Sequence, residues 1–570
     1  MSNIEQMQQL IAVARGDSPA DILLKNARVL NVFTGEIETT GVAVYGDKIA
    51  GVGNYTKAKD IIDLAGRYLA PGLLNGHTHL ESSMLDVGQY ARAVVPHGTS
   101  AIITDLHEIA NVSGIEGIRY VLRSARRLPF DLFLMAPSCV PATSMETSGA
   151  ALGYEDITRI LRFKECIGLG EMMNYPGVLF GDESVLAKID AARHGVVDGH
   201  SPGVSGNVLN AYIGAGISSD HESVACEEAR EKLSRGMYVM IREGSSEKNL
   251  EALLPLVTDK TYPRCMFVVD DRHGKDILHD GDIDAVVRKA IRLGLEPVRA
   301  VQLATINTAT YFRLKGYGAV APGYYASFLI LDDLADFRIA SVYYRGKKVA
   351  ENGKPLFDLP HIPPGRLVHT INIKPFTVDR LKVKTTNETM PVIEIVPGQI
   401  ITRKKLMKVT VENGCALPDV SRDILKAVVV ERHHATGNIG TGLVTGFGIK
   451  RGAIASSTAH DSHNIVCVGT SDEDIITAVK EIERLQGGQV VVCEGKVTGR
   501  LPTPIAGLLA DRPLEDVVAG VANLEKQAKE LGATVPAPFS VLSFIALAVI
   551  PELRLTDLGL VDVNEFKLIK

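Results

Sequence analysis

Two histidines one residue apart, His77 and His79, directly follow the apolar run at 71–75. Successive side chains of a strand point to opposite faces, so residues two apart point the same way and their imidazoles can converge. Imidazole is a good ligand for divalent zinc, iron, manganese or nickel. Core or surface histidines also occur at this spacing, so the motif alone predicts half of a metal site.

Residues 71 to 275 repeat a short apolar strand, a polar or charged tip and an amphipathic helical stretch, roughly every 25 residues. Eight such units predict the α/β class and, within it, a (β/α)8 TIM-like barrel, in which chemistry occurs where the strands end. Asp, Ser and His are also favoured in loops and helix caps, but here four histidines and three carboxylates fall in register. The predicted strand tips end at His79, Glu108, Ser138, Glu171, His200, His221, Ser245 and Asp271.

Short strand-like segments flank the predicted barrel on both sides. Residues 20 to 70 alternate strands and turns, and the pattern returns at 317 to 353, so we expect the two segments to meet in one small flanking β-sandwich. A proline-rich link at 355–365 then leads to a separate region. The predicted domains are an N-terminal helix with the first part of the sandwich (1–70), the barrel (71–315), the returning part of the sandwich (316–360) and a C-terminal α/β domain (366–570).

Composition limits the functional classes. The chain has 570 residues, 46% hydrophobic residues and a net charge of -6, so it has no basic excess for nucleic acid. Its polar N-terminus lacks the apolar core of a signal peptide, and no apolar run approaches about 18 residues. We therefore expect a cytoplasmic protein that does not enter a membrane. The seven cysteines form no Cys-x-x-Cys pair, which argues against a disulfide framework or a zinc ribbon.

Long motifs carry a family resemblance. The segment PGLLNGHTHLESSML, the β-segment before it and the returning PGYYASFLILDD resemble the amidohydrolase superfamily of metal-dependent hydrolases. More narrowly, TDLHEIAN, GLGEMMN, GHSPG, SSDHE and VDDRH resemble the adenine deaminases. The stretch ERHHATGNIGTGLVTGFGIKRGAIASSTAHDSHN at 431–464 resembles that family's second domain, so the resemblance covers nearly the whole chain.

The resemblance implies two divalent metal ions, with manganese expected and with iron and zinc suited to the same ligands. The histidines of the first strand would bind one ion, and those of the fifth and sixth strands the other. Glu171 would bridge the ions, because its two oxygens can each accept one metal. Asp270 would be a ligand and proton shuttle, with the adjacent Asp271 as the alternative. The implied metal ligands are His77, His79, Glu171, His200, His221 and Asp270.

The reaction implied by the resemblance is hydrolysis of adenine to hypoxanthine and ammonia, as in purine salvage. A metal-bridged hydroxide would attack C6, and Asp270 or Asp271 would pass a proton to the leaving amino group. Attack on the aromatic ring also needs a proton at the adjacent ring nitrogen. Glu108 is the candidate acid and substrate contact, and Glu81 is the second candidate. Either could instead be a solvated or helix-capping carboxylate.

Other functions fit less well. An amidohydrolase acting on another aminopurine or a cyclic amide is the alternative, but such enzymes usually carry a lysine where this chain has Glu171. A cytidine-type deaminase would need H-x-E followed by P-C-x-x-C, which is absent. The segment 460–463, His-Asp-Ser-His, is interpreted as a structural or domain-interface element, with metal binding or a direct contact to the active site as alternatives. For a cytosolic enzyme we expect a homodimer or higher homo-oligomer, with adenine as its small-molecule partner.

Overall fold

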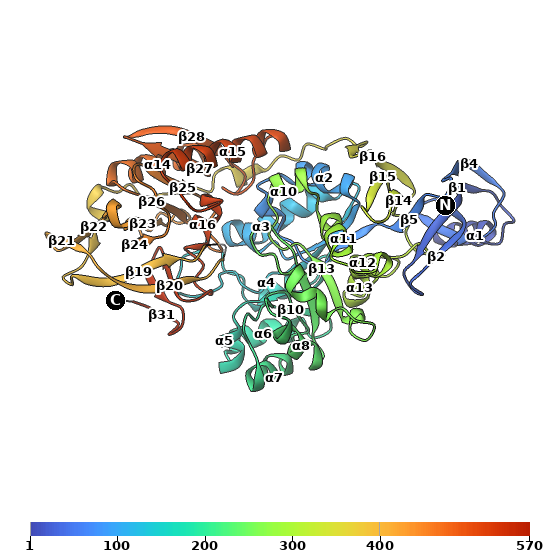
Figure 1. Cartoon of the computed structure of the whole chain (residues 1–570), viewed down its shortest axis with the longest axis horizontal. Helices are drawn as coiled ribbons and strands as arrows, with labels where there is room; N and C mark the ends of the chain where they lie inside the picture. Colours follow the sequence, from blue (N-terminus) through green and yellow to red (C-terminus); the bar gives the residue numbers. More distant parts are fainter. Residues whose placement is uncertain (1, 398, 570) are drawn as a thin grey trace.

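The computed structural model describes residues 2–397 and 399–569. Figure 1 shows three parts side by side: a sheet that carries the N-terminus, a central barrel, and a C-terminal region on the opposite side of the barrel. Among the described residues, no helix is long and apolar enough to cross a membrane.

The predicted barrel is present, with all eight strands parallel to their neighbours. Strands β6 to β10 form one sheet and β11 to β13 a second. The amide of Ser218 donates to the carbonyl of Val197 at 3.0 Å, which links β10 to β11. A parallel bridge between Thr78 and Asp270 joins the last strand to the first. The barrel strands are β6 (Leu73–Asn75), β7 (Thr99–Thr104), β8 (Asp131–Ala136), β9 (Cys166–Met172), β10 (Val196–Gly199), β11 (Ser219–Asp220), β12 (Tyr238–Arg242) and β13 (Cys265–Val268).

Helices cover the outside of the barrel, so its strands are buried on both faces. This is why they are nearly continuous apolar runs, such as TSAIIT in β7, where every residue is buried. Helices α12 and α13 follow the last barrel strand and complete this outer layer. The helices of this part are α2 (Val87–Val94), α3 (His107–Ala125), α4 (Tyr154–Ile160), α5 (Tyr175–Phe180), α6 (Glu183–Ala191), α7 (Gly206–Gly214), α8 (Cys226–Ser234), α9 (Leu250–Leu253), α10 (Gly274–His279), α11 (Ile283–Arg292), α12 (Pro297–Leu303) and α13 (Ile306–Tyr311).

The two flanking β-segments meet in one nine-stranded sheet, with helix α1 (Asn3–Ala14) packed on it. Strand β14 pairs antiparallel with β5, which joins the segment after the barrel to the one before it. Leu24 and Val44 from the first segment and Phe328 from the second share one apolar cluster. The strands are β1 (Ala20–Asn31), β2 (Glu36–Tyr45), β3 (Lys48–Val52), β4 (Ala58–Asp63), β5 (Tyr68–Pro71), β14 (Phe328–Asp333), β15 (Arg338–Tyr344), β16 (Lys347–Glu351) and β17 (Lys354–Pro355).

The C-terminal region is built on an eight-stranded sheet in the order β20-β19-β24-β23-β26-β25-β27-β28. Its central strand β23 is apolar at almost every position because both faces are covered: Val428 and Val430 pack toward α14, and Val429 belongs to the core shared with the barrel. The main-sheet strands are β19 (Thr389–Ile395), β20 (Thr402–Lys408), β23 (Leu425–Val430), β24 (Ile439–Thr445), β25 (Ala453–Ser456), β26 (Ile465–Gly469), β27 (Gly488–Cys493) and β28 (Lys496–Pro502).

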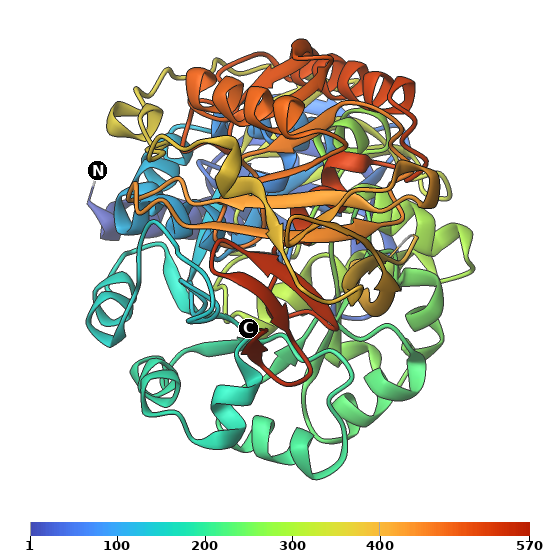
Figure 2. The same ribbon diagram turned by 90° about the vertical axis from the view of Figure 1, so that its left-hand side faces the viewer.

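Two small sheets and three helices complete the C-terminal region. In Figure 2 this region lies in front of the barrel. Helices α14 and α15 pack on opposite faces of the main sheet, with α15 on the face toward the barrel. The remaining elements are β18 (Val383–Lys384), β21 (Thr410–Glu412), β22 (Cys415–Leu417), β29 (Leu553–Thr556), β30 (Gly559–Asp562), β31 (Lys567–Leu568), α14 (Asp472–Leu485), α15 (Leu514–Glu530) and α16 (Pro538–Phe544).

The C-terminal region docks on the barrel through the long loop that follows β8. Thr147 donates its amide and hydroxyl to the carboxylate of Asp557 at 2.9 and 2.6 Å. Asn464 donates to the carbonyl of Thr147 at 2.8 Å, and Arg92 on α2 forms a salt bridge of 2.7 Å with Glu515 on α15. The carboxyl ends of the barrel strands, where the predicted site residues lie, therefore face the second domain.

Arg554 holds together the segment that joins α16 to β29. The side chain is fully buried, and its guanidinium donates to the carbonyls of Ile550, Phe544 and Ile400 at 2.7 Å each, and to that of Pro551 at 3.0 Å. A planar fork of donors suits this task, whereas a lysine would provide a single point charge. The stability of this segment depends on these bonds.

We expect Arg554→Leu to lower the free energy of unfolding by about 3 kcal/mol or more, because several buried carbonyls would lose their donors. Urea denaturation monitored by circular dichroism measures this. The control is Arg451→Leu, because Arg451 is exposed and should change stability by no more than about 0.5 kcal/mol. Equal stabilities for the two variants would contradict the role given to Arg554.

Candidate metal centre and active site

The structure brings all six predicted metal ligands together at the carboxyl mouth of the barrel. They come from the ends of five strands: two histidines follow β6, and one residue each lies at the end of β9, β10, β11 and β13. Their side chains are all buried, with residue exposures of 6% or less. The converging residues are His77, His79, Glu171, His200, His221 and Asp270.

Glu171 lies in the middle of this cluster, with its two carboxylate oxygens facing different histidines. Oε1 lies 3.4 Å from Nε2 of His79 and 3.9 Å from Nε2 of His77. Oε2 lies 2.7 Å from Nδ1 of His200 and 3.2 Å from Nε2 of His221. The carboxylate thus divides the histidines into two pairs, which is the arrangement required of a bridging ligand.

The donor set fits a pair of divalent ions. With metal–ligand bonds of about 2.0–2.2 Å, ligand atoms around one tetrahedral ion lie about 3.3–3.6 Å apart. Asp270 Oδ1 lies 3.1 Å from Nε2 of His79 and 3.3 Å from Nε2 of His77. In addition, Nε2 of His77 and Nε2 of His200 are buried without a hydrogen-bond partner among the described residues. Buried imidazole nitrogens left unpaired among these carboxylates suit metal coordination.

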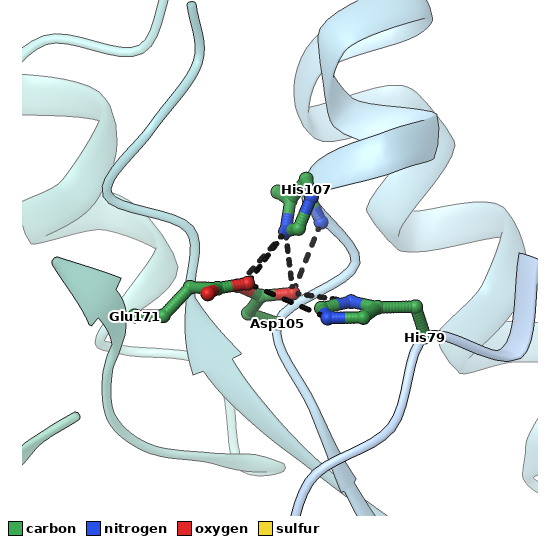
Figure 3. A group of neighbouring side chains, drawn as sticks. All are labelled: His79, Asp105, His107 and Glu171. Carbon is green, nitrogen blue, oxygen red and sulfur yellow. Dashed lines mark hydrogen bonds and ion pairs between the residues drawn. The ribbon is translucent and has the colours of Figure 1, made fainter. Parts of the chain in front are cut away.

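Asp105 and His107, which sequence reasoning did not select as ligands or catalytic groups, lie beside the cluster. Figure 3 shows them between His79 and Glu171, with Asp105 in the loop after β7 and His107 at the start of α3. Asp105 Oδ1 lies 3.4 Å from Nδ1 of His79 and 3.0 Å from Nδ1 of His107. A carboxylate on Nδ1 would orient the ring and leave Nε2 of His79 free for a metal.

Leu106 between these two residues is buried and has a positive φ of 55°. This left-handed conformation is rare for a bulky residue and must be held by its surroundings. It turns the chain so that Asp105 and His107 both face the cluster. In the sequence, Asp105 and Glu108 both follow the same buried strand as polar residues, and the sequence-based prediction selects Glu108.

Asp270, and not Asp271, points into the histidine cluster. Its backbone amide donates to the carbonyl of His77 at 3.0 Å, and its carbonyl accepts from the amide of His79 at 3.2 Å. Asp271 is directed to the side, where its carboxylate accepts a hydrogen bond from the hydroxyl of Ser82. The geometry therefore favours Asp270 of the two sequence-based alternatives.

Arg242 binds the second carboxylate oxygen of Asp270. Its Nη1 donates to Oδ2 of Asp270 at 2.9 Å, and the same guanidinium is paired with Glu222. Burial disfavours a charged Asp270, but the two histidines and Arg242 outweigh this and hold its pKa well below the usual range. Neither Arg242 nor Glu222 was selected from the sequence, although both lie next to strand tips that were.

Glu108 is held by two histidines of the C-terminal domain. Nδ1 of His460 lies 2.6 Å from Oε1 of Glu108, and Nε2 of His463 contacts Oε2. Nε2 of His107 lies 3.3 Å from Oε1. Burial opposes charge on Glu108, but His460, His463 and His107 together keep its pKa well below the ordinary value. The segment at 460–463 therefore contacts the active site directly.

Glu81, the second candidate acid, lies behind the cluster in the short 3-10 turn after His79. Its Oε1 accepts from the amide of Ile109 at 3.3 Å, and its Oε2 has no partner among the described residues. Burial and the nearby Glu108 raise the pKa of Glu81 to about 7. The side chain does not border the cavity above the cluster, so the structure does not bring it to the predicted substrate position.

A small cavity of about 40 Å³ lies above the cluster. It adjoins a larger cavity of about 470 Å³ between the two domains, and Asp271, His460 and Phe544 line both. The smaller space alone is too small for a purine ring. A substrate must therefore bind where the cavities join, or the cover must move. The C-terminal domain supplies that cover through Ile400, His460, Asp461, Phe544, Leu547 and Ile550.

Two family models match this chain. Residues 68–349 match the amidohydrolase family, and residues 399–567 match the adenine deaminase C-terminal domain. The eight-stranded barrel carries buried histidines and carboxylates at its carboxyl mouth. By fold and by sequence the chain is therefore an amidohydrolase, a class that uses divalent metal ions.

Similar curated proteins extend along the whole chain. An adenine deaminase of Dehalococcoides mccartyi is 61% identical over 563 residues, which are 99% of each chain. Adenine deaminase 2 of Carboxydothermus hydrogenoformans is 48% identical over 99% of each chain. An adenine deaminase of Methanothrix thermoacetophila is 45% identical over 98% of each chain. The chain belongs to the adenine deaminase family.

The pairing of His460 with Glu108 predicts a loss of stability at alkaline pH. Burial lowers the pKa of His460, but Glu108 outweighs burial and raises it to about 9. The folded-state pKa thus exceeds the unfolded value of about 6.5. The contribution is fully present below about pH 6.5 and is lost as the pH rises through about 9.

We therefore expect His460→Gln to be less stable than the unmodified protein by up to about 3 kcal/mol near pH 6.5, with a difference that shrinks above pH 9. Melting temperatures between pH 6 and 10 measure this difference. His279→Gln, at an exposed position, is the control and should show a small, constant difference. A constant difference for His460→Gln would contradict the charged pairing.

Proposed function

We propose that this chain hydrolyses adenine at C6 to hypoxanthine and ammonia. The observation that carries this proposal is the position of Glu171, which places one carboxylate oxygen toward each of two histidine pairs. The whole-length similarity to adenine deaminases supports adenine as the substrate. The carboxylate of Glu171 also distinguishes this site from amidohydrolase sites in which a lysine bridges the two ions.

We assign six metal ligands to two ions. His77, His79 and Asp270 would hold one ion, His200 and His221 the other, and Glu171 would bridge them. Two divalent ions held there would lower the pKa of a shared water toward about 7, and so supply hydroxide at neutral pH. We propose manganese for both positions, because nitrogen and carboxylate ligands suit it; iron and zinc accept the same donors.

We assign the proton transfer to Asp270. Its Oδ1 lies among the metal-facing nitrogens, while Arg242 fixes its Oδ2. A carboxylate held in this way can accept a proton from the attacking water and pass it to the amino group as ammonia leaves. Asp271 would remain at the cavity wall, and Glu108 would position His460 against the substrate space.

The cover supplies the apolar surface that a flat purine needs. Phe544 stacks on the imidazole of His460, with ring centroids 4.7 Å apart and an interplanar angle of 15°. Leu547 and Ile550 pack with Met173 of the barrel in one apolar cluster. Ligand sites commonly combine such apolar walls with a few placed polar groups. We propose that adenine binds between this cover and the metal centre.

We also propose that the chain works in the cytoplasm as a homodimer or higher homo-oligomer, since closed homo-oligomers are the commonest assemblies of soluble enzymes. One exposed surface is apolar: Ile4, Met7 and Ile11 lie one turn apart on α1 and are 69%, 62% and 51% exposed. Sedimentation velocity measures the mass of the particle in solution, and a monomer at micromolar concentration would contradict the assembly.

Purified, manganese-supplemented protein should release ammonia from adenine. Adenosine, guanine, cytosine and dihydroorotate offered in parallel test the substrate class. Turnover of adenine alone with about two ions per chain is expected. If a full metal pair is bound but adenine is inert while a cyclic amide or another aminopurine reacts, the adenine assignment is wrong and the metal centre stands.

His200→Ala should lower the metal content by about one ion per chain and reduce turnover by at least about 10²-fold, because one ion would lose a ligand. Metal analysis and ammonia release measure the two effects. His279→Ala is the matched control at an exposed histidine. Near-normal rates with full metal content would remove His200 from the mechanism.

A further inference from the structure

Asp461 reaches the metal centre from the C-terminal domain and has a free oxygen there. The residue is 2% exposed and lines the small cavity together with the metal-facing histidines. Its Oδ1 lies 3.8 Å from Nε2 of His107, and its Oδ2 has no hydrogen-bond partner among the described residues. A buried carboxyl oxygen left unpaired beside a substrate space points to a hydrogen bond made with the substrate.

Apart from Glu247, the other carboxylates that line this cavity are already engaged. Both oxygens of Glu108 contact histidines of the C-terminal domain. Glu222 and Asp270 are paired with Arg242. Glu171 faces four histidines, and Asp271 accepts from Ser82. Glu108, the acid expected from the sequence, is thus a poor proton donor.

Asp461 is close enough to act on a substrate bound at the metal centre. Nδ1 of His107 lies 3.5 Å from Oε1 of Glu171, and Nε2 of the same ring lies 3.8 Å from Asp461. One imidazole ring therefore separates Asp461 from the carboxylate that we assign as the bridge. Asp461 and Glu171 line the same small cavity, so a purine with its C6 over the metal centre can turn N1, which is bonded to C6, toward Asp461.

The chemistry of the reaction requires an acid at this place. As the oxygen of water bonds to C6, the C6=N1 electron pair moves to N1, which must take up a proton. A protonated Asp461 would give that proton and become a carboxylate. When the C6–N bond breaks, the electron pair leaves with ammonia, which has received through Asp270 the proton of the hydroxyl bonded to C6, and that oxygen forms the C6=O bond. N1 keeps its proton in hypoxanthine, and Asp461 regains one from water.

The surroundings of Asp461 make it easier to protonate than an exposed aspartate. Burial raises the pKa of Asp461 to about 6, against the opposing effect of His107. The nearby Glu108 also raises it. The titratable groups that face Asp461 are His107, Glu108, Cys139, Glu146, Glu171 and His460.

We propose that Asp461 of the C-terminal domain is the catalytic acid that protonates N1 of adenine. This inference deepens the proposed adenine deamination and rests on it. It also gives the second domain a chemical task, because the barrel would hold the metal centre and the second domain would supply the acid for the ring.

The test compares Asp461→Asn with the unmodified enzyme, both loaded with manganese, by kcat/KM for adenine from pH 5 to 9. We expect a loss of about 10²–10⁴-fold, with metal content and melting temperature close to those of the unmodified enzyme. Because the acid must be protonated, kcat/KM should fall as the pH rises. This fall, the alkaline limb of the pH profile, should disappear in Asp461→Asn. Asp461→Glu, which keeps a carboxyl, should retain the limb.

Two comparison variants separate catalysis from structure. Asp557→Asn changes another buried aspartate of the domain interface that lies outside the cavity; it should lower the melting temperature and leave the alkaline limb unchanged. Glu247→Gln changes the other cavity carboxyl, on the loop after β12, whose pKa burial raises to about 8. If Glu247→Gln removes the limb, Asp461 is not the acid.

The outcomes distinguish this inference from the function on which it rests. If the unmodified, metal-loaded enzyme releases no ammonia from adenine, the proposed function fails and the role of Asp461 fails with it. If the unmodified enzyme is active and Asp461→Asn keeps its rate and its alkaline limb, only the role of Asp461 is overturned.

Discussion

The active site depends on one carboxylate, that of Glu171, shared between two pairs of buried histidines. Burying so many ionisable groups is costly unless opposite charges or metal ions balance them. The barrel makes the arrangement achievable because its parallel strands all end at one mouth, and five strand ends contribute a side chain. Arg242 then fixes Asp270 by a hydrogen bond, and Asp105 lies 3.4 Å from Nδ1 of His79, so that little freedom is left to Asp270 when an ion binds.

The second domain is part of this site as well as its cover. His460 and His463 hold Glu108, and the segment that includes Phe544 closes the space above the metal centre. The segment is itself tied down by Arg554. A purine bound as proposed would be enclosed by groups from two domains, which would exclude water from the reacting atoms and strengthen the electrostatic interactions around them.

The barrel and the metal-facing groups could be predicted from the sequence because they leave local signals. Each strand is a short apolar run with a polar tip. The His-x-His spacing of His77 and His79 predicts that both rings point the same way. Asp105 has the same kind of signal, but the neighbouring Glu108 was chosen instead. The contact of His460 with Glu108 joins residues 352 positions apart. No local pattern encodes how two domains dock, so this contact needed the structure.

The nine-stranded sheet has a consequence for how the chain must be made. Strand β5, just before the barrel, pairs on one side with β1 and on the other with β14, which comes after the barrel. During synthesis on the ribosome, the second edge of segment 68–71 therefore stays unpaired until residues 328–331 have been made. Pairing over such a separation closes a long loop and is slow, and unpaired edges invite association with other chains. The barrel of this protein cannot be complete, with its flanking sheet closed, until well over half of the chain has been synthesised.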